Sequence, residues 1–234
     1  SNGTALAYIC ISLPNLWLAA CQNKILNLRQ DAARFHWVKE YVRNACKISI
    51  PIAIQNILMS GAQIVSTMIV APLGNIAIAA HSFAITAESL CYMPGYGIGD
   101  AATTLVGQTH GANRMDLCKN FAYMTVGLGM AVMALMGVVM YVFAPEMIGL
   151  LSPVESIQEL GTTCLRIEAF AEPFFAASIV TYSVCVGAGD TFKPAAINLS
   201  TMWFVRLTLA YGLSKSYGLE GVWIAMAVEL TFRG

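Results

Sequence analysis

Long apolar stretches, separated by short polar segments, are the feature that most limits what this chain can fold into. Runs of about 20 largely apolar residues, the length that a membrane-spanning helix needs, recur along the sequence. One ends near residue 20, and the others cover residues 48–70, 77–107, 120–143, 160–186, 195–213 and 219–234. Membrane barrels show alternating ten-residue segments instead. We therefore expect an all-α polytopic membrane protein, a six-helix transmembrane bundle preceded by the end of another helix.

The composition excludes several other classes of protein. Of the 234 residues, 57% are hydrophobic and 11% are charged, against about 45–50% and about 25% in soluble domains. The net charge is zero, which argues against a nucleic-acid partner. The seven cysteines are an odd number and form no CxxC motif, so we expect neither a disulfide framework nor a metal site.

The basic residues indicate the orientation of the chain in the membrane. If residues 21–47 are cytoplasmic, most of the Lys and Arg residues in the loops fall on the inner side, and only Arg166 and Lys215 on the outer side. This distribution satisfies the positive-inside rule. We therefore expect a multi-pass protein of the plasma or inner membrane, with the last helix leaving inward at Arg233. Residues 28–47 have the pattern of an amphipathic helix on the inner leaflet, or equally of a connector helix.

Two local motifs predict where helices bend and begin. The segment MPGYGIG (93–99) contains one Pro and three Gly, so it predicts a kink or local unwinding within residues 77–107. Ser152-Pro153-Val154-Glu155 is a capping box with Pro at the first helical position. It predicts a helix that begins at Ser152.

Several motifs, in order, resemble the C-terminal half of the multidrug and toxic compound extrusion (MATE) transporters. They are VAPLGNIAIAAH (70–81), LVGQTHGANRMD (105–116), GAGDT (187–191), MWFVRL (202–207) and GLEGVWIAM (218–226). The resemblance implies one lobe of a twelve-helix, two-lobed transporter. Residues 1–20 would then be the end of helix six, residues 21–47 a cytoplasmic basic linker, and residues 48–234 the lobe of helices seven to twelve, with the last one truncated. The missing N-terminal lobe would be its partner.

The resemblance also implies a function. We expect a secondary active antiporter that exports amphipathic or cationic drugs or metabolites in exchange for H⁺ or Na⁺ by alternating access. Its partners would be the lipid bilayer and a small-molecule substrate, and it would need no cofactor beyond the coupling ion. A lipid-linked precursor flippase of the same superfamily would need several Arg and Lys in its cavity, whereas only Arg206 lies within an apolar stretch. A membrane-embedded enzyme is less favoured, because no HExxH or similar catalytic set occurs.

Five acidic residues fall inside the apolar stretches: Glu88, Asp100, Glu168, Glu172 and Glu229. A charge at membrane depth costs about 2.5–3.5 kcal/mol on insertion scales, so such residues normally face the protein interior or a wet cavity. The spacing of Glu168 and Glu172 predicts that they share one helix face. Two carboxylates so close disfavour double ionisation, so one should hold a proton unless a cation binds. An alternative pairs Glu168 with Arg166 and leaves only Glu172 in the cavity.

The remaining candidates divide into binding residues and a structural pair. Glu88 precedes the expected kink, where unwound backbone carbonyls can help to bind a cation. Asp100 follows the kink and has an alternative as the partner of freed backbone donors or of Arg114. Arg206 and Glu229, at similar depth on neighbouring helices, are expected to form a structural ion pair.

Polar and aromatic side chains supply further candidates for the cavity. Gln55, Asn56 and Tyr92 are expected to line it, although interhelical hydrogen bonds would explain the two amides equally. Some branches of the family carry acids at the positions of Met59 and Phe175 here. Because both positions are apolar in this chain, the resemblance leaves the coupling ion open between H⁺ and Na⁺.

Overall fold

The computed structural model describes residues 10, 12–14, 17 and 39–234. The expected end of helix six and most of the expected linker, residues 18–38 included, lie outside the described residues. Residues 44–234 form one compact unit, which contains all of the features discussed below.

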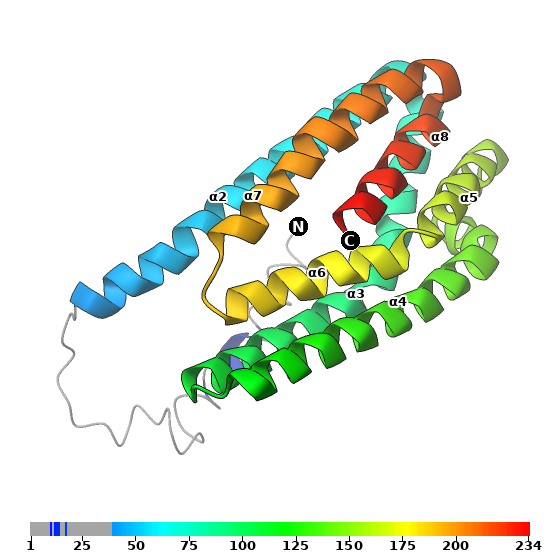
Figure 1. Ribbon diagram of the computed structural model, residues 1–234. Helices are drawn as coiled ribbons and strands as arrows, with labels where there is room; N and C mark the ends of the chain where they lie inside the picture. The colour runs from blue at the N-terminus through cyan, green and yellow to red at the C-terminus, as the bar shows by residue number, and fades with distance from the viewer. Residues whose placement is uncertain (1–9, 11, 15–16, 18–38) are drawn as a thin grey trace. The chain divides into compact units, whose positions relative to one another are not determined.

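The described part of this unit is helical throughout (Figure 1). A helix covers each of the apolar stretches expected from residue 48 onward. The elements are α2 (Lys39–Val70), a 3-10 turn (Ala71–Leu73), α3 (Asn75–Gly111), α4 (Met115–Leu151), α5 (Glu155–Ala169), α6 (Glu172–Gly187), α7 (Phe192–Ser200), a π-helical segment (Thr201–Arg206) and α8 (Leu207–Arg233).

Three of these helices, α2, α3 and α4, are long and apolar enough to cross a membrane. The pair α5 and α6 adds a fourth span if it is counted as one broken span, because the two helices meet at a bend of 59°. The chain then continues through α7 and the π-helical segment into α8. Helix α8 turns back on itself at Gly218, whose φ of 59° lies in the left-handed region that glycine adopts without strain.

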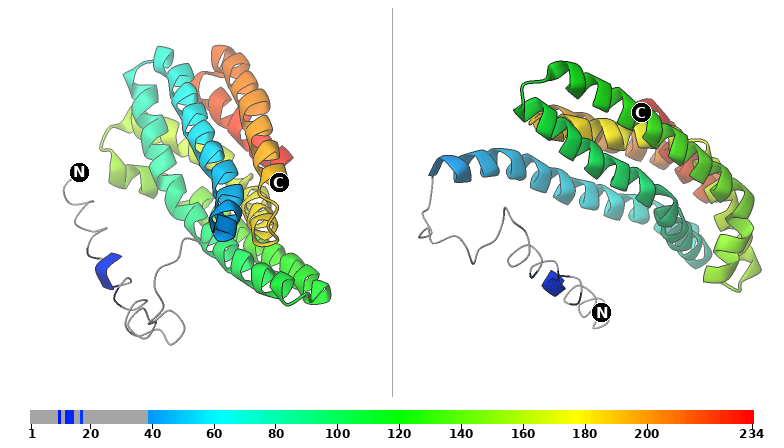
Figure 2. Two further views of the ribbon diagram at one scale, coloured as in Figure 1. Left: turned by 90° about the vertical axis from the view of Figure 1, so that its left-hand side faces the viewer. Right: turned by 90° about the horizontal axis from the view of Figure 1, so that it is seen from below.

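The helices pack as two groups, and the groove described in the next section opens between them. Helices α3, α4 and α6 lie side by side, and α5 packs against α3, α4 and α8 (Figures 1 and 2). Helix α2 packs against the π-helical segment and the start of α8 through Ala62, Met202 and Leu207. The main core, which includes Met140 and Trp223, fills the space between α3, α4, α5 and α8.

Helix α2 begins earlier than expected. The sequence predicted a span from residue 48, after a separate amphipathic helix, but a single helix runs from Lys39 to Val70. Residues 39–50 contain no glycine or proline that would end a helix. Pro51 lies inside the helix, so one lost backbone hydrogen bond does not interrupt it.

The unwinding expected near Pro94 does not occur, and a helix break occurs in another span. Helix α3 is continuous through Pro94. The interruption falls instead between Ala169 and Glu172, just before Pro173. Because proline has no N–H, Pro173 cannot donate to the carbonyl of Ala169 four residues earlier, and the helix ends there. Pro173 itself occupies the first turn of α6, where the missing donor costs nothing.

The expected helix start at Ser152 also shifts. Ser152 is the C-terminal cap of α4 and has an extended backbone, and the next helix begins at Glu155. The Ser152 hydroxyl accepts a hydrogen bond from the backbone N–H of Val154 at 3.3 Å. The side chain of Gln158 donates to the Ser152 carbonyl at 2.8 Å. The motif therefore stabilises the tight connection between α4 and α5 rather than opening a helix itself.

Candidate functional site

A groove of about 600 Å³ opens between α2, α3, α6, the π-helical segment and α8. Apolar residues such as Ile52, Ile179 and Leu230 form much of its wall. Its polar and charged lining residues are Gln55, Asn56, Ser60, Gln63, Glu88, Tyr96, Asp100, Thr103, Ser178, Tyr182, Ser183, Asn198, Arg206 and Arg233. An apolar cavity with a few convergent polar groups is the usual form of a small-molecule site.

Helix α2 contributes the amide side chains that the sequence placed in a cavity. Gln55 and Asn56 both line the groove, and Gln63 lines it two turns further along the helix. Gln55 is buried, and within the described part of the chain its Oε1 has no hydrogen-bond partner. Met59 lies on the same wall and Phe175 also lines the groove, so both positions that carry acids in other branches face it here as apolar residues.

An aromatic cluster forms part of the α3 and α6 walls. Tyr96 and Phe175 line the groove, whereas Tyr92, the expected lining residue, packs against both of them instead. The ring centroid of Tyr92 lies 5.6 Å from that of Tyr96 and 5.8 Å from that of Phe175, in edge-to-face geometry. Tyr92 therefore supports the aromatic wall and does not form its surface.

Two of the expected carboxylates reach the groove from α3. Glu88 is only 4% exposed, and Asp100, three helical turns further along, is exposed. The alternative partner proposed for Asp100, Arg114, instead forms an ion pair with Asp116 at 3.2 Å. Asp100 is therefore free of that arginine and accessible from the groove.

Glu168 and Glu172 do not line the groove, contrary to the expectation that they share a face of one helix. The break at Ala169 separates them, so Glu168 lies in the last turn of α5 and Glu172 is the first residue of α6. Both side chains are fully buried, and neither carboxylate has a hydrogen-bond partner among the residues that the structure describes. The alternative pairing of Glu168 with Arg166 does not form either, because Arg166 is exposed and donates to the carbonyl of Tyr141 at 3.4 Å.

These two residues and Glu88 form a buried acid cluster. Glu88 interacts electrostatically with Glu168 and with Glu172, so the three carboxyl groups lie within range of one another. Glu88 is the member that reaches the groove. Among the described residues, no Arg or Lys nitrogen lies within 4.0 Å of any of the three. The cluster is thus neither exposed to lipid nor neutralised by ion pairs.

The break in the span gives the two buried glutamates different helix-end environments. A helix N-terminus stabilises a nearby negative charge and a C-terminus opposes one. Glu172 lies in the first turn of α6 and Glu168 in the last turn of α5.

Helix α4 can approach this break closely because of Gly137, where an added Cβ would lie 2.7 Å from the Ala169 carbonyl oxygen.

The expected ion pair between Arg206 and Glu229 is not formed. Glu229 pairs instead with Arg233, one turn further along α8, at 3.3 Å. Helical spacing of four residues brings these two side chains together, whereas Arg206 would have to reach across from the π-helical segment. The Nη2 of Arg206 contacts the sulfur of Met226 at 2.6 Å, and its Nε has no hydrogen-bond partner.

Arg233 is the functional residue that the sequence interpretation missed. It was expected to leave the membrane on the inner side, but its side chain is only 6% exposed and lines the groove. By Arg233 the helix has risen only about 22 Å from Gly218, at 1.5 Å per residue, which is less than the membrane thickness. Its four-residue spacing from Glu229 was the signal in the sequence that would have found this pair.

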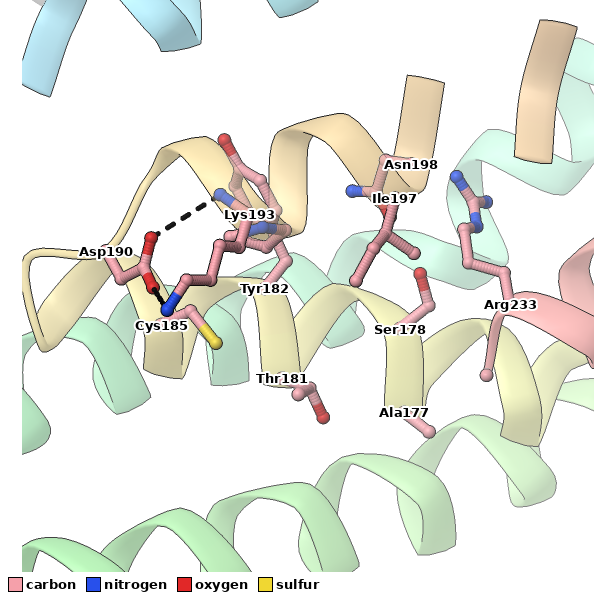
Figure 3. Close-up of a pocket in the computed structure, with 12 residues that line it drawn as sticks. Ala177, Ser178, Thr181, Tyr182, Cys185, Asp190, Lys193, Ile197, Asn198 and Arg233 are labelled. Atoms are coloured by element: carbon pink, nitrogen blue, oxygen red, sulfur yellow. Dashed lines mark hydrogen bonds and ion pairs between the residues drawn. The ribbon is translucent and has the colours of Figure 1, made fainter. Parts of the chain in front are cut away.

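Arg233 also lines a second, smaller pocket of about 240 Å³ between α6 and α7 (Figure 3). Tyr182, Ser178 and Asn198 line both cavities. At the other end of this pocket, Lys193 forms an ion pair with Asp190 at 3.2 Å. The exposure of this pair makes it a surface feature worth little stability.

Comparison with known proteins gives consistent matches. The sequence model of the MatE family matches residues 51–212. A probable multidrug resistance protein NorM of Thermotoga maritima is 28% identical over 189 residues, which are 80% of this chain and 41% of that protein. The chain spans about half the length of the curated relatives it matches, for example 47% of the uncharacterized transporter YisQ of Bacillus subtilis, at 25% identity and over 91% of this chain.

Solved structures agree on the fold. A MOP superfamily transporter from Pyrococcus furiosus matches with a TM-score of 0.86 at 16% identity, covering 96% of this chain and 52% of that one. The Vibrio cholerae MATE transporter VcmN in its bent form matches with a TM-score of 0.79 at 16% identity, over 99% of this chain and 50% of that one. At such identities the likeness shows the fold alone.

Proposed function

Because the chain belongs to the MatE family of membrane transporters, we propose that it forms the C-terminal lobe of a secondary active antiporter. The complete protein would export amphipathic or cationic drugs or metabolites in exchange for H⁺ or Na⁺. The two lobes would alternate access to a cavity at the membrane midplane. The names of the NorM relatives support drug export as the class of activity.

The observation that carries this proposal is the place of Glu88. It is a buried carboxylate on an apolar groove, and it interacts electrostatically with Glu168 and Glu172 behind the wall. A charge at this depth costs free energy unless a cation, a proton or a positively charged substrate neutralises it. Substrate and coupling ion would therefore compete for the same negative charge, which is the condition for exchange.

The flippase alternative receives less support. A site for a lipid-linked pyrophosphate needs several free cationic groups. The groove holds Arg206 and Arg233, and Arg233 is already paired with Glu229. Glu88 and Asp100 on the facing wall would repel a polyanion.

Ion-driven efflux by the complete transporter in proteoliposomes tests the proposal. With an imposed H⁺ or Na⁺ gradient, the unaltered protein should move a fluorescent organic cation, and both Glu88→Gln and Glu172→Gln should reduce the rate by about ten-fold or more. Glu146→Gln, an exposed residue on α4 outside the groove, is the matched control and should retain the rate. Normal efflux by both Glu88→Gln and Glu172→Gln would show that the acid cluster does not couple transport.

A further inference from the structure

Arg206 is held inside the lobe without an acidic partner. It is 7% exposed, and its Nε is buried without a hydrogen-bond partner. Within the part of the chain that the structure describes, no carboxylate oxygen lies within 4.0 Å of it. Its guanidinium donates to the sulfurs of Met226 and Met202, which are weak acceptors.

An unpaired guanidinium at this depth is unfavourable. Leaving a buried charge without its partner is strongly destabilising. Glu229, which the sequence predicted as the partner of Arg206, is already paired with Arg233. The guanidinium senses the charge of Glu88 but contacts no carboxylate among the described residues, so its fork of N–H donors is open to a carboxylate or phosphate in bidentate geometry.

The local backbone directs this side chain into the groove. Thr201–Arg206 is a π-helical segment, a rare form that is frequently found at functional sites. It places both Met202 and Arg206 on the groove wall. Asn198, one turn before the segment, lines the same wall and adds amide hydrogen-bonding capacity.

The groove therefore presents free groups of both signs. Glu88 lies on the α3 wall and Arg206 at the end of the π-helical segment, and their charges interact. A ligand with only a positive group would satisfy Glu88 and leave Arg206 unpaired. We infer that the groove takes zwitterionic amphiphiles, whose anionic group binds Arg206 while their cationic group lies toward Glu88.

This inference rests on the proposed function, since it assumes that the groove is the substrate path, and it narrows the substrate class. A competing explanation gives Arg206 an acidic partner from the other lobe. That arrangement would make Arg206 structural, so its loss would affect all ligands alike. Binding of two ligands that differ only in one carboxylate separates the two explanations.

The test measures dye binding to the purified complete transporter by fluorescence anisotropy. Rhodamine B carries a free carboxylate and a delocalised cation, and its ethyl ester keeps only the cation. Arg206→Gln should weaken binding of rhodamine B by about ten-fold or more, the loss of one charged hydrogen-bonded contact, and change binding of the ester by less than about two-fold. Retained ester binding shows that the variant is folded.

Two further measurements keep the result decisive. Arg206→Lys retains the charge and should recover part of the rhodamine B affinity, and Arg166→Gln, an exposed arginine outside the groove, should bind both dyes normally. Benzoate should compete with rhodamine B and not with the ester in the unaltered protein. The inference would be overturned if Arg206→Gln weakened binding of both dyes equally or of neither. It would also be overturned if the unaltered protein did not bind rhodamine B. Selective binding of rhodamine B without ion-driven efflux would instead support it and contradict the proposed antiport.

Discussion

Glu229 and Arg233 form a buried ion pair one turn apart on α8, with 3.3 Å between Oε1 and Nε. The pair places a positive charge beside the buried Glu229 from within its own helix. It thereby leaves Arg206, at similar depth, available to the groove. Among the described residues, the pattern of buried charge follows from this choice of partner: an ion pair within α8, Arg206 with no carboxylate in contact, and a cluster of unpaired acids.

This pair predicts a specific pattern of stability. Glu229→Gln should lower the free energy of unfolding of the complete transporter by about 3–5 kcal/mol, because it leaves Arg233 buried and unpaired. The double variant Glu229→Gln with Arg233→Met should recover most of that loss. Equilibrium unfolding in mixed micelles, with an increasing fraction of a denaturing detergent, measures the free energy of unfolding of both variants. A double variant less stable than the single one would show that Arg233 has another essential partner.

The approach of α4 to the broken span predicts a second effect on stability. A Cβ at Gly137 would lie 2.7 Å from the Ala169 oxygen, so Gly137→Ala should destabilise by about 1–3 kcal/mol through overpacking. Gly127→Ala, on the same helix and with open space around it, should be neutral or stabilise by up to about 1 kcal/mol. The same unfolding measurement checks the pair. Equal effects at the two positions would contradict the close contact.

The break between α5 and α6 should depend on Pro173. Pro173→Ala restores a donor for the Ala169 carbonyl, so it should straighten the 59° bend. Glu168 and Glu172 would then move from their present positions. The distance between spin labels at Ser156 and Thr181, measured by double electron–electron resonance, should then increase. Pro94→Ala serves as control, because α3 is already continuous, and should leave this distance unchanged. An unchanged distance in Pro173→Ala would mean that packing alone holds the bend.

Glu88 and Glu172 should differ in which step they affect. Glu88 lines the groove, so Glu88→Gln should weaken both binding of an organic cation and ion-driven efflux. Glu172 lies behind the wall, so Glu172→Gln should change equilibrium binding by less than about two-fold while efflux falls by about ten-fold or more. Anisotropy and proteoliposome efflux on the same preparations separate the two. Weakened binding in Glu172→Gln would place its carboxylate in the site itself.

The sequence predicted the class of fold and much of the groove, because both depend on local patterns. Apolar stretches locate the helices, and the amides of α2, Gln55 and Asn56, face the groove as their positions indicated. Glu88 was also identified, although the unwound backbone expected beside it at Pro94 is absent, because α3 is continuous there.

What the sequence did not predict depends on choices between similar local signals. Pro94 and Pro173 each remove one helix hydrogen bond, and only packing decides which span absorbs the loss. Pro173 falls where a new helix can begin, so the break costs least there. The partner of Glu229 was likewise a choice between a neighbour on the same helix and one across the lobe. The nearer one, Arg233, prevails because the helix itself holds the two side chains together.

The most direct test of the account is competition between substrate and coupling ion for the charge at Glu88. Binding of an organic cation to the complete transporter would be measured across a series of H⁺ and Na⁺ concentrations. The account predicts that the apparent dissociation constant rises in proportion to the concentration of one of these ions, and that Glu88→Gln removes this dependence. A dissociation constant that is the same at every concentration of both ions would contradict it.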